Sequence, residues 1–492
     1  MRGTRTRSLT LVTASAIMMT ALAPGAAIAA LASDQGSVRF SLQHRVGFAS
    51  GDDWEPAIAA DRFGHEYVLY KHYDVPGGGT CPACDVHLLI QRSSNGGRSW
   101  TAPRAIAPVA VDGGQYDPQI AVDPVDGRTL WASFLQNANS VIGVVESTDF
   151  GETWSPVRVV SHGLIGLDKD SLVVRGRTVA VAYDDGFSTY ASVSQDGGRQ
   201  WTTRLVTPGS DRFNLPLSAG GGIDSKGNLY FAWNSFDAAH SANGDGPVTL
   251  WLTRSSDEGK TWQRVVIAVS GAPPPCSGCG FAYLSAQMTM RIGPDDAVYL
   301  LWNGTVDQTD FAPERIFFSR SRDHGRTFSP RREVSTAPAG AEHAFPAIVV
   351  GDRAGDVRLA WMDTPQVAPD GTGTWNVRYR ATEDDGQKLG PEVRISRFVP
   401  GYPYLTPAGF ASPYGDYFQM AIDASDATVL AFGEGPNYGG PGNIWVSHQL
   451  QTGEPDIAAG GPDIAAMVGA TGIAPEPLAS VRAVDARALR VR

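Results

Sequence analysis

The stretch that decides the fold of this chain reads Ser147-Thr148-Asp149-Phe150-Gly151-Glu152-Thr153-Trp154. Four further stretches repeat its pattern of Ser, Asp or Asn, Gly and a closing aromatic residue, and a more divergent sixth follows them. These copies are Ser93–Trp100, Ser194–Trp201, Ser255–Trp262, Ser321–Phe328 and Thr382–Leu389. Consecutive copies end 47 to 66 residues apart, the length of a four-stranded sheet with variable loops. The spacing therefore predicts one repeated unit of β-structure.

Each copy has the chemistry of a tight turn. An Asp or Asn accepts hydrogen bonds from backbone N–H groups further along the turn, Gly takes a positive φ, and the closing ring packs on the sheet. These roles leave little for catalysis. We therefore assign the following acidic and amide residues to turn structure: Asn95, Asp149, Asp196, Asp257, Asp323 and Asp384.

The pattern Ser-x-Asp-x-Gly-x-Thr-Trp resembles the Asp-box, or BNR repeat, of the sialidase-like β-propellers. The resemblance implies an all-β fold, with one propeller over residues 30–450. Two alternating apolar strands precede each box, and a seventh such pair, Tyr417–Phe432, has no box. That last unit lacks an outer strand, and Val38–Gln43 is an alternating segment with no unit of its own. We predict seven four-stranded blades closed by this N-terminal strand, with six blades as the alternative.

The two ends of the chain have different compositions. Residues 1–29 combine a basic start, an apolar stretch and a small-x-small site, which is typical of a signal peptide and predicts secretion. Residues 451–492 are rich in Ala, Gly and Pro and are expected to be a disordered tail. No later apolar run is long enough for a membrane span.

The overall composition narrows the class of partner. With 42% hydrophobic and 18% charged residues, the chain is globular rather than disordered or coiled coil. A net charge of −11 argues against nucleic acid and anionic membranes as partners. We expect a soluble, extracellular monomer.

Function in a propeller is expected at the mouth of the central channel, in the loops before each innermost strand and after each second strand. The catalytic candidates there are Asp117, Asp168, Asp170 and Asp416. The substrate-binding candidates are Glu55, Tyr116, Lys169, Arg212, His343 and Tyr417. Such acids act as an acid and base pair on a glycan, or hold Ca²⁺, or simply form turns, and the sequence leaves these alternatives open.

Sialidases bind the carboxylate of their substrate with arginines, the first of which lies in a motif that opens blade 1. The triplet at this position is Trp54-Glu55-Pro56, which lacks arginine and would repel a carboxylate. The resemblance therefore implies a secreted propeller that recognises an extracellular glycan, with hydrolysis of that glycan left open and true sialidase activity disfavoured. The alternative is a non-catalytic propeller that binds a protein or a cell surface.

The four cysteines form two C-x-x-C pairs, Cys81 with Cys84 and Cys276 with Cys279. In an exported protein each pair is expected to form a disulfide. The alternative is a metal site with four thiolate ligands, the usual zinc pattern.

Overall fold

The computed structural model describes residues of the unit Val38–Arg492. The described ranges are 38–47, 52–73, 86–108, 114–137, 139–161, 166–207, 218–236, 246–272, 285–364, 375–396, 405–406, 409–410, 417–434 and 443–451. Several predictions concern residues outside these ranges: the signal peptide, all but the first residue of the tail, Arg212, Asp416 and the four cysteines.

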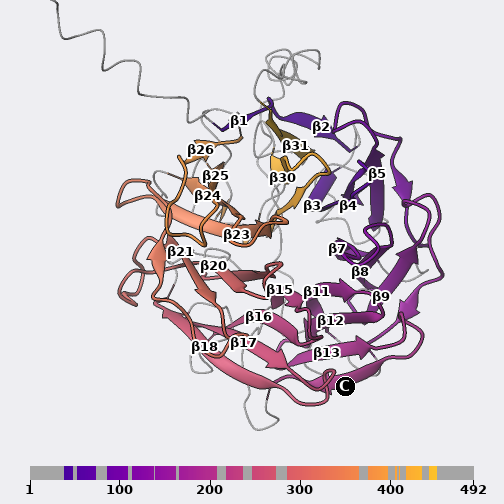
Figure 1. Cartoon of the computed structure of the whole chain (residues 1–492), viewed down its shortest axis with the longest axis horizontal. Helices are drawn as coiled ribbons and strands as arrows, with labels where there is room; N and C mark the ends of the chain where they lie inside the picture. Colours follow the sequence, from indigo (N-terminus) through magenta and orange to yellow (C-terminus); the bar gives the residue numbers. More distant parts are fainter. Residues whose placement is uncertain are drawn as a thin grey trace, which may run out of the picture. The chain divides into compact units, whose positions relative to one another are not determined.

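The chain forms a seven-bladed β-propeller, as predicted (Figure 1). Every blade is an antiparallel sheet whose first strand lies innermost. Blade 1 consists of β3 (Asp52–Ala60), β4 (Glu66–Tyr73), β5 (Val86–Ser93) and β6 (Arg104–Ala105). Blade 2 consists of β7 (Tyr116–Val122), β8 (Leu130–Gln136), β9 (Val141–Ser147) and β10 (Arg158–Val159). Blade 3 consists of β11 (Asp168–Arg175), β12 (Thr178–Asp184), β13 (Thr189–Ser194) and β14 (Thr202–Leu205).

The next three blades have the same order of strands. Blade 4 consists of β15 (Ser218–Ile223), β16 (Leu229–Phe236), β17 (Val248–Ser255) and β18 (Gln263–Ser270). Blade 5 consists of β19 (Met288–Ile292), β20 (Val298–Gly304), β21 (Arg315–Ser321) and β22 (Arg332–Glu333). Blade 6 consists of β23 (Glu342–Val350), β24 (Val357–Thr364), β25 (Asn376–Thr382) and β26 (Val393–Arg394). A small hairpin of β27 (Leu405–Thr406) and β28 (Gly409–Phe410) follows. None of the described residues forms a helix able to span a membrane.

Blade 7 contains strands from both ends of the chain. Its inner strands are β29 (Gln419–Ile422), β30 (Thr428–Glu434) and β31 (Asn443–Leu450), and both β1 (Arg39–Phe40) and β2 (His44–Val46) pair with β31. Closure of the ring by an N-terminal strand is therefore confirmed. The strand is interrupted where Val38–Gln43 was expected to be continuous, and it resumes at His44. Between its two parts Ser41 still contacts β31, because its N–H donates to the His448 carbonyl at 2.8 Å.

The hydrophobic core is divided among the blade interfaces. One buried cluster lies between each pair of neighbouring blades, for example around Leu69 and Phe134 between blades 1 and 2. The interface between blades 7 and 1 has its own cluster, which includes Val446 and Val68. Burial of apolar area therefore holds the ring together blade by blade.

The Asp-boxes form the predicted turns between the third and fourth strands. In blade 2, Thr153 N–H donates to Asp149 Oδ1 at 2.9 Å, and the Ser147 hydroxyl donates to the same oxygen at 2.8 Å. Gly151 N–H donates to Ser147 Oγ at 2.9 Å. The other copies repeat this pattern, including the divergent one at Asp384. Because strands alternate in direction, the boxes lie at the end of the blades opposite the start of each innermost strand.

The innermost strands carry bulges at the other end, which we call the mouth end. The pairing register shifts there in blades 1, 2, 3, 4 and 6. Within these bulges four residues other than glycine have positive φ, a sparsely populated conformation that is frequent at functional sites. They are Glu55 (52°), Asp117 (49°), Lys169 (47°) and Phe345 (52°).

Candidate functional site

The mouth of blade 1 holds a buried ion pair. Lys71 Nζ lies 2.6 Å from Glu55 Oε2, and both side chains are almost fully buried. The same ammonium lies 5.0, 5.7 and 5.3 Å from the ring centroids of Trp54, Tyr73 and Tyr116. Burial by itself lowers the pKa of Lys71, but Glu55, Tyr73 and Asp117 together outweigh it and raise that pKa above its usual value. Lys71 therefore stays charged, held by a carboxylate and three aromatic rings.

A second lysine joins blades 2 and 3. Lys169 Nζ lies 2.9 Å from Asp117 Oδ2 and 3.5 Å from Asp168 Oδ1. Burial on its own would raise the pKa of Asp117, but the charges of Lys169 and Lys71 lower it below its usual range. Asp117 is therefore an ionised carboxylate that is hard to protonate.

Asp170, next to this ion pair, has a pKa shifted in the opposite direction. It is 2% exposed and accepts a hydrogen bond from the Ser133 hydroxyl. Burial and, to a smaller extent, the negative charge of Asp117 raise its pKa well above the usual value, although the bond from Ser133 opposes this. Its Oδ1 has no hydrogen-bond partner among the described residues. Asp170 therefore holds its proton to higher pH than Asp117 does.

We call these six residues the lysine-paired cluster: Glu55, Lys71, Asp117, Asp168, Lys169 and Asp170. The structure thus brings together five of the sequence candidates, with Tyr116 against Lys71 as a sixth. Tyr417 lies near them, since its hydroxyl donates to the Pro118 carbonyl at 3.1 Å. Lys71 was not among the ranked candidates, although the end of a second strand was expected at the mouth.

A cavity of about 1050 Å³ runs along the innermost strands. Asp117, Lys169, Asp170 and Tyr417 line it at the mouth end. Asp184 differs from them: it is fully buried, burial and the charge of Asp168 raise its pKa, and it does not line the cavity. Asp117 and Asp170 are therefore the two acids of the cluster that a ligand in the channel would meet.

His343, the remaining described candidate, belongs to a separate group at the mouth ends of blades 5 and 6. Its Nδ1 contacts the Glu314 carbonyl at 2.7 Å, and burial lowers the pKa of His343 to about 3. Glu314 and Glu342 are buried beside it without a lysine, and we call these two the acid pair. Burial raises the pKa of Glu342 to about 8 and that of Glu314 well above its usual value.

The acid pair is held by amide groups. Glu314 N–H donates to Glu342 Oε1 at 2.8 Å, and Asn303 donates its side-chain amide to Glu314 Oε2. Sequence reasoning missed Glu314 because it considered only the starts of first strands and the ends of second strands. The start of a third strand lies at the same end of the blade, so the alternation of strand direction alone would have found it.

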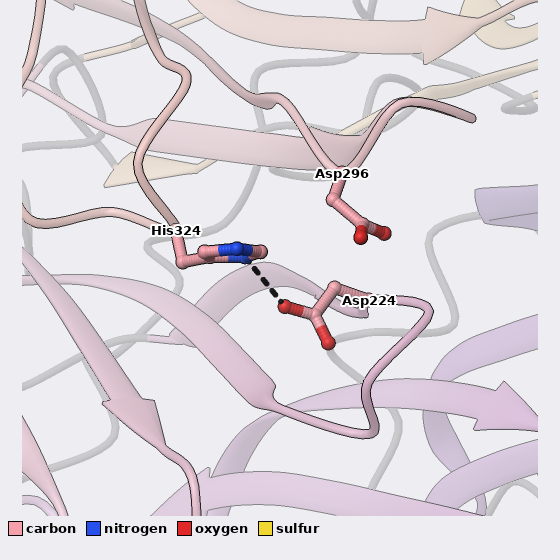
Figure 2. Close-up of side chains that lie close together, drawn as sticks. All are labelled: Asp224, Asp296 and His324. Carbon is pink, nitrogen blue, oxygen red and sulfur yellow. Dashed lines mark hydrogen bonds and ion pairs between the residues drawn. The ribbon is translucent and has the colours of Figure 1, made fainter.

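Three potential metal ligands gather at the opposite end, between blades 4 and 5. One ligand atom each of Asp224, Asp296 and His324 lies within 4.8 Å of the others, and Figure 2 shows the contact of His324 Nδ1 with Asp224 at 3.1 Å. Asp224 also accepts a hydrogen bond from Tyr230 at 2.9 Å, as Asp61 does from Tyr67 at 2.7 Å in blade 1.

The turn chemistry accounts for these three residues. Asp296 accepts from the backbone and hydroxyl of Ser225 at 2.7 and 2.6 Å, and Lys226 Nζ lies 3.0 Å from His324 Nε2. A metal ion would have to displace the lysine and compete with these hydrogen bonds. In the lysine-paired cluster, likewise, Ca²⁺ would have to displace Lys169 from Asp117.

The comparisons with known proteins agree with the repeat. Residues 43–273 match the family model of the BNR repeat-like domain. The chain is a β-propeller whose sequence is similar to the BNR repeat-like domain over these residues. A curated relative of this propeller, the xyloglucanase Xgh74A of Acetivibrio thermocellus, is 26% identical over 317 residues, which cover 56% of this chain. The match covers 33% of the xyloglucanase, so the chain spans about a third of its relative's length.

Solved structures similar to this propeller include two that cover most of it. A Dyadobacter fermentans protein of unknown function has a TM-score of 0.49 and 14% identity, covering 85% of this chain and 100% of its own. The Hadza microbial sialidase Hz136 has a TM-score of 0.45 and 13% identity, with 82% of this chain and 66% of the sialidase covered.

Proposed function

We propose that the chain is a secreted glycoside hydrolase that cleaves a neutral polysaccharide at the mouth of the propeller. The observation that carries the proposal is the pairing of a carboxyl with a raised pKa and one with a lowered pKa, Asp170 and Asp117, on neighbouring blades in one cavity. Pairs of acids whose surroundings push their pKa values apart are the usual arrangement for acid and base roles.

The two acids take different roles in this proposal. Asp170 donates its proton to the glycosidic oxygen of the leaving sugar, and its high pKa keeps that proton available near neutral pH. Asp117, whose pKa is lowered by Lys169, is a poor base. It is better suited to act as a nucleophile or to stabilise the positive charge that develops on the sugar ring.

The choice of a neutral substrate rests on charge and on similarity. Glu55 stands where sialidases have an arginine, and both lysines of the cluster already contact carboxylates. A substrate carboxylate would find no unpaired cation in the lysine-paired cluster. The sequence similarity to a xyloglucanase supports a neutral β-glucan as the first substrate to test.

The test is turnover of xyloglucan and other neutral polysaccharides by the purified protein. We expect Asp170→Asn and Asp117→Asn each to lower kcat by at least about 100-fold. The melting temperature should stay close to that of the wild type for Asp170→Asn, whereas Asp117→Asn should lower it because Lys169 loses its nearest partner. Asp184→Asn is the matched control, because this acid is equally buried at the same mouth but does not line the cavity.

The alternative of a binding module has some support, since Asp117 and Asp170 are only 5% and 2% exposed. Retention of polysaccharides in affinity electrophoresis without turnover, unchanged by either substitution, would favour that alternative and reject the hydrolase.

Secretion and the disulfides belong to the same proposal. Mass spectrometry of protein from the culture medium should give a mature N-terminus near Ala30, and intact protein should have no thiols that react before reduction. A cytosolic product that retains residues 1–29 would contradict secretion.

A further inference from the structure

Arg291 is an arginine inside the central cavity with few partners. It belongs to β19, the innermost strand of blade 5, and lines the cavity together with Thr289. Its Nη1 donates to the Met290 carbonyl at 2.8 Å. A guanidinium has five N–H donors, and no other hydrogen bond or ion pair of Arg291 exists among the described residues.

One glycine of a run in the neighbouring blade, Gly220, makes room for this side chain. The innermost strand of blade 4 contains Gly220, Gly221 and Gly222 in sequence. A Cβ added at Gly220, where φ is 128°, would lie 2.9 Å from Thr289 Oγ1 and 3.4 Å from Arg291 Nη1. Any side chain at this position would therefore crowd both groups. The Thr289 hydroxyl and the Arg291 guanidinium therefore both lie next to Gly220, where the neighbouring strand has no side chain.

The charge of Arg291 is not balanced by the protein. Burial is the sole cause that lowers its pKa, so no described carboxylate acts on it appreciably. By contrast, Arg353, which lines the same cavity, has Asp356 and Glu383 each at 3.7 Å. Arg291 is partly buried in the cavity, where an arginine keeps its charge, so an anion that enters the cavity could pair with it.

We propose that the cavity contains an anion site at Arg291, with the Thr289 hydroxyl as a second donor, that takes a small oxyanion such as a carboxylate or a sulfate. The planar fork of the guanidinium can bind two oxygens of such an ion at once. This site is independent of the proposed hydrolase, because it uses none of the residues of the lysine-paired cluster.

The first test locates the ion. Crystals of the wild-type protein soaked in selenate, whose selenium scatters anomalously, should show an anomalous peak beside the Arg291 guanidinium. Crystals of Arg291→Gln should lack it. A parallel bromide soak distinguishes oxyanion from halide: a peak with bromide and none with selenate would reject the proposed oxyanion class.

The second test measures binding in solution through stability. At constant pH and ionic strength, sulfate and acetate should raise the melting temperature of the wild type more than that of Arg291→Gln, because an ion that binds the folded state stabilises it. The comparison of sulfate with acetate shows whether an inorganic ion or a carboxylate is preferred. Arg353→Gln is the control, and it should keep the wild-type increment.

Two outcomes would overturn the proposal. In the first, the anions raise the melting temperature of the wild type and of Arg291→Gln by the same amount. In the second, Arg175→Gln, which changes another arginine that lines the cavity, loses this rise in melting temperature while Arg291→Gln keeps it. If Arg291→Gln does not fold, Arg291→Lys keeps the charge without the fork. It should fold with a clearly smaller oxyanion increment, and an undiminished one would reject the site.

Discussion

The lysine-paired cluster and the acid pair occupy the same end of the propeller, yet Asp117 in the first and Glu342 in the second have pKa values shifted in opposite directions. In blades 1 to 3, Lys71 and Lys169 keep Glu55 and Asp117 paired with cations. In blades 5 and 6, Glu314 and Glu342 meet amide groups and each other, and burial raises the pKa of both, although the charge of Arg315 opposes this at Glu342. Burial is similar at Asp117 and Glu342, so the two close lysines of Asp117 account for its lowered pKa.

The presence or absence of a close lysine also determines the pH range over which each region can exchange protons. Ionised carboxylates in close ion pairs keep their charge over a wide pH range, whereas a buried acid pair without a directly bound cation exchanges a proton as the pH rises. Asp170 combines the two situations, because it lies beside the cation of Lys169 and its pKa is nevertheless raised. The lysine-paired cluster is therefore the region suited to proton transfer to a ligand.

The largest expected effect comes from removing a cation. Lys71→Met leaves Glu55 buried without its partner and should lower the free energy of unfolding by about 3–5 kcal/mol in urea titrations. The double variant Lys71→Met/Glu55→Gln should recover part of this loss. Lys260→Met, which breaks the exposed pair with Glu258, is the control and should leave stability unchanged. A small effect for Lys71→Met would show that the cluster does not depend on its cations.

The second prediction concerns the acid pair and pH. Burial raises the pKa of Glu342 from 4.5 to about 8 in the folded state. Between these values the unfolded chain releases a proton that the folded chain keeps. The free energy of unfolding should therefore fall as the pH rises from 4.5 to about 8 and then level off, by about 1–4 kcal/mol in all.

Urea titrations at several pH values would measure that slope. Glu342→Gln should remove its contribution, because the amide does not ionise. An unchanged slope in the variant would mean that another group carries the pH dependence.

The smallest effect is expected at the Asp-boxes, where Asp149 accepts its hydrogen bonds from its own turn. Asp149→Ala removes three hydrogen bonds from Ser147 and Thr153 and should cost about 1–2 kcal/mol of stability. Asp149→Asn should cost less, since Asn95 makes the corresponding contacts in blade 1. A variant that kept its melting temperature but lost polysaccharide binding would contradict a purely structural role for the boxes.

The repeat explains why so much of the fold could be predicted from the sequence. The spacing of the six boxes gives the length of a blade. The seventh strand pair, near the C-terminus, has no box and needs an outer strand, which the N-terminal segment can supply. The same regularity placed Asp117 and Lys169 at equivalent positions of neighbouring blades. Their contact was foreseeable as one of the possible outcomes of crowded acids, because innermost strands converge on one channel.

What the sequence did not reveal depends on side-chain direction. Glu55, Asp117 and Lys169 lie in bulges with positive φ, and a shift of one residue in a strand turns a side chain to the other face. The aromatic surroundings of Lys71 combine residues from two blades, and the position of Arg291 depends on glycines of another strand. Such long-range coincidences leave no periodic signal in the sequence.

The closure of blade 7 by β1 and β2 affects the order in which this protein can fold during synthesis. The Ser41 carbonyl accepts a hydrogen bond from Ser447, 406 positions later in the chain. The ribosome must therefore complete six blades before the first strands can find their partner, and until then the ring is open with two exposed edges. Closure joins segments that are far apart in the chain, so we expect the protein to be most prone to aggregate before β31 pairs with β1 and β2.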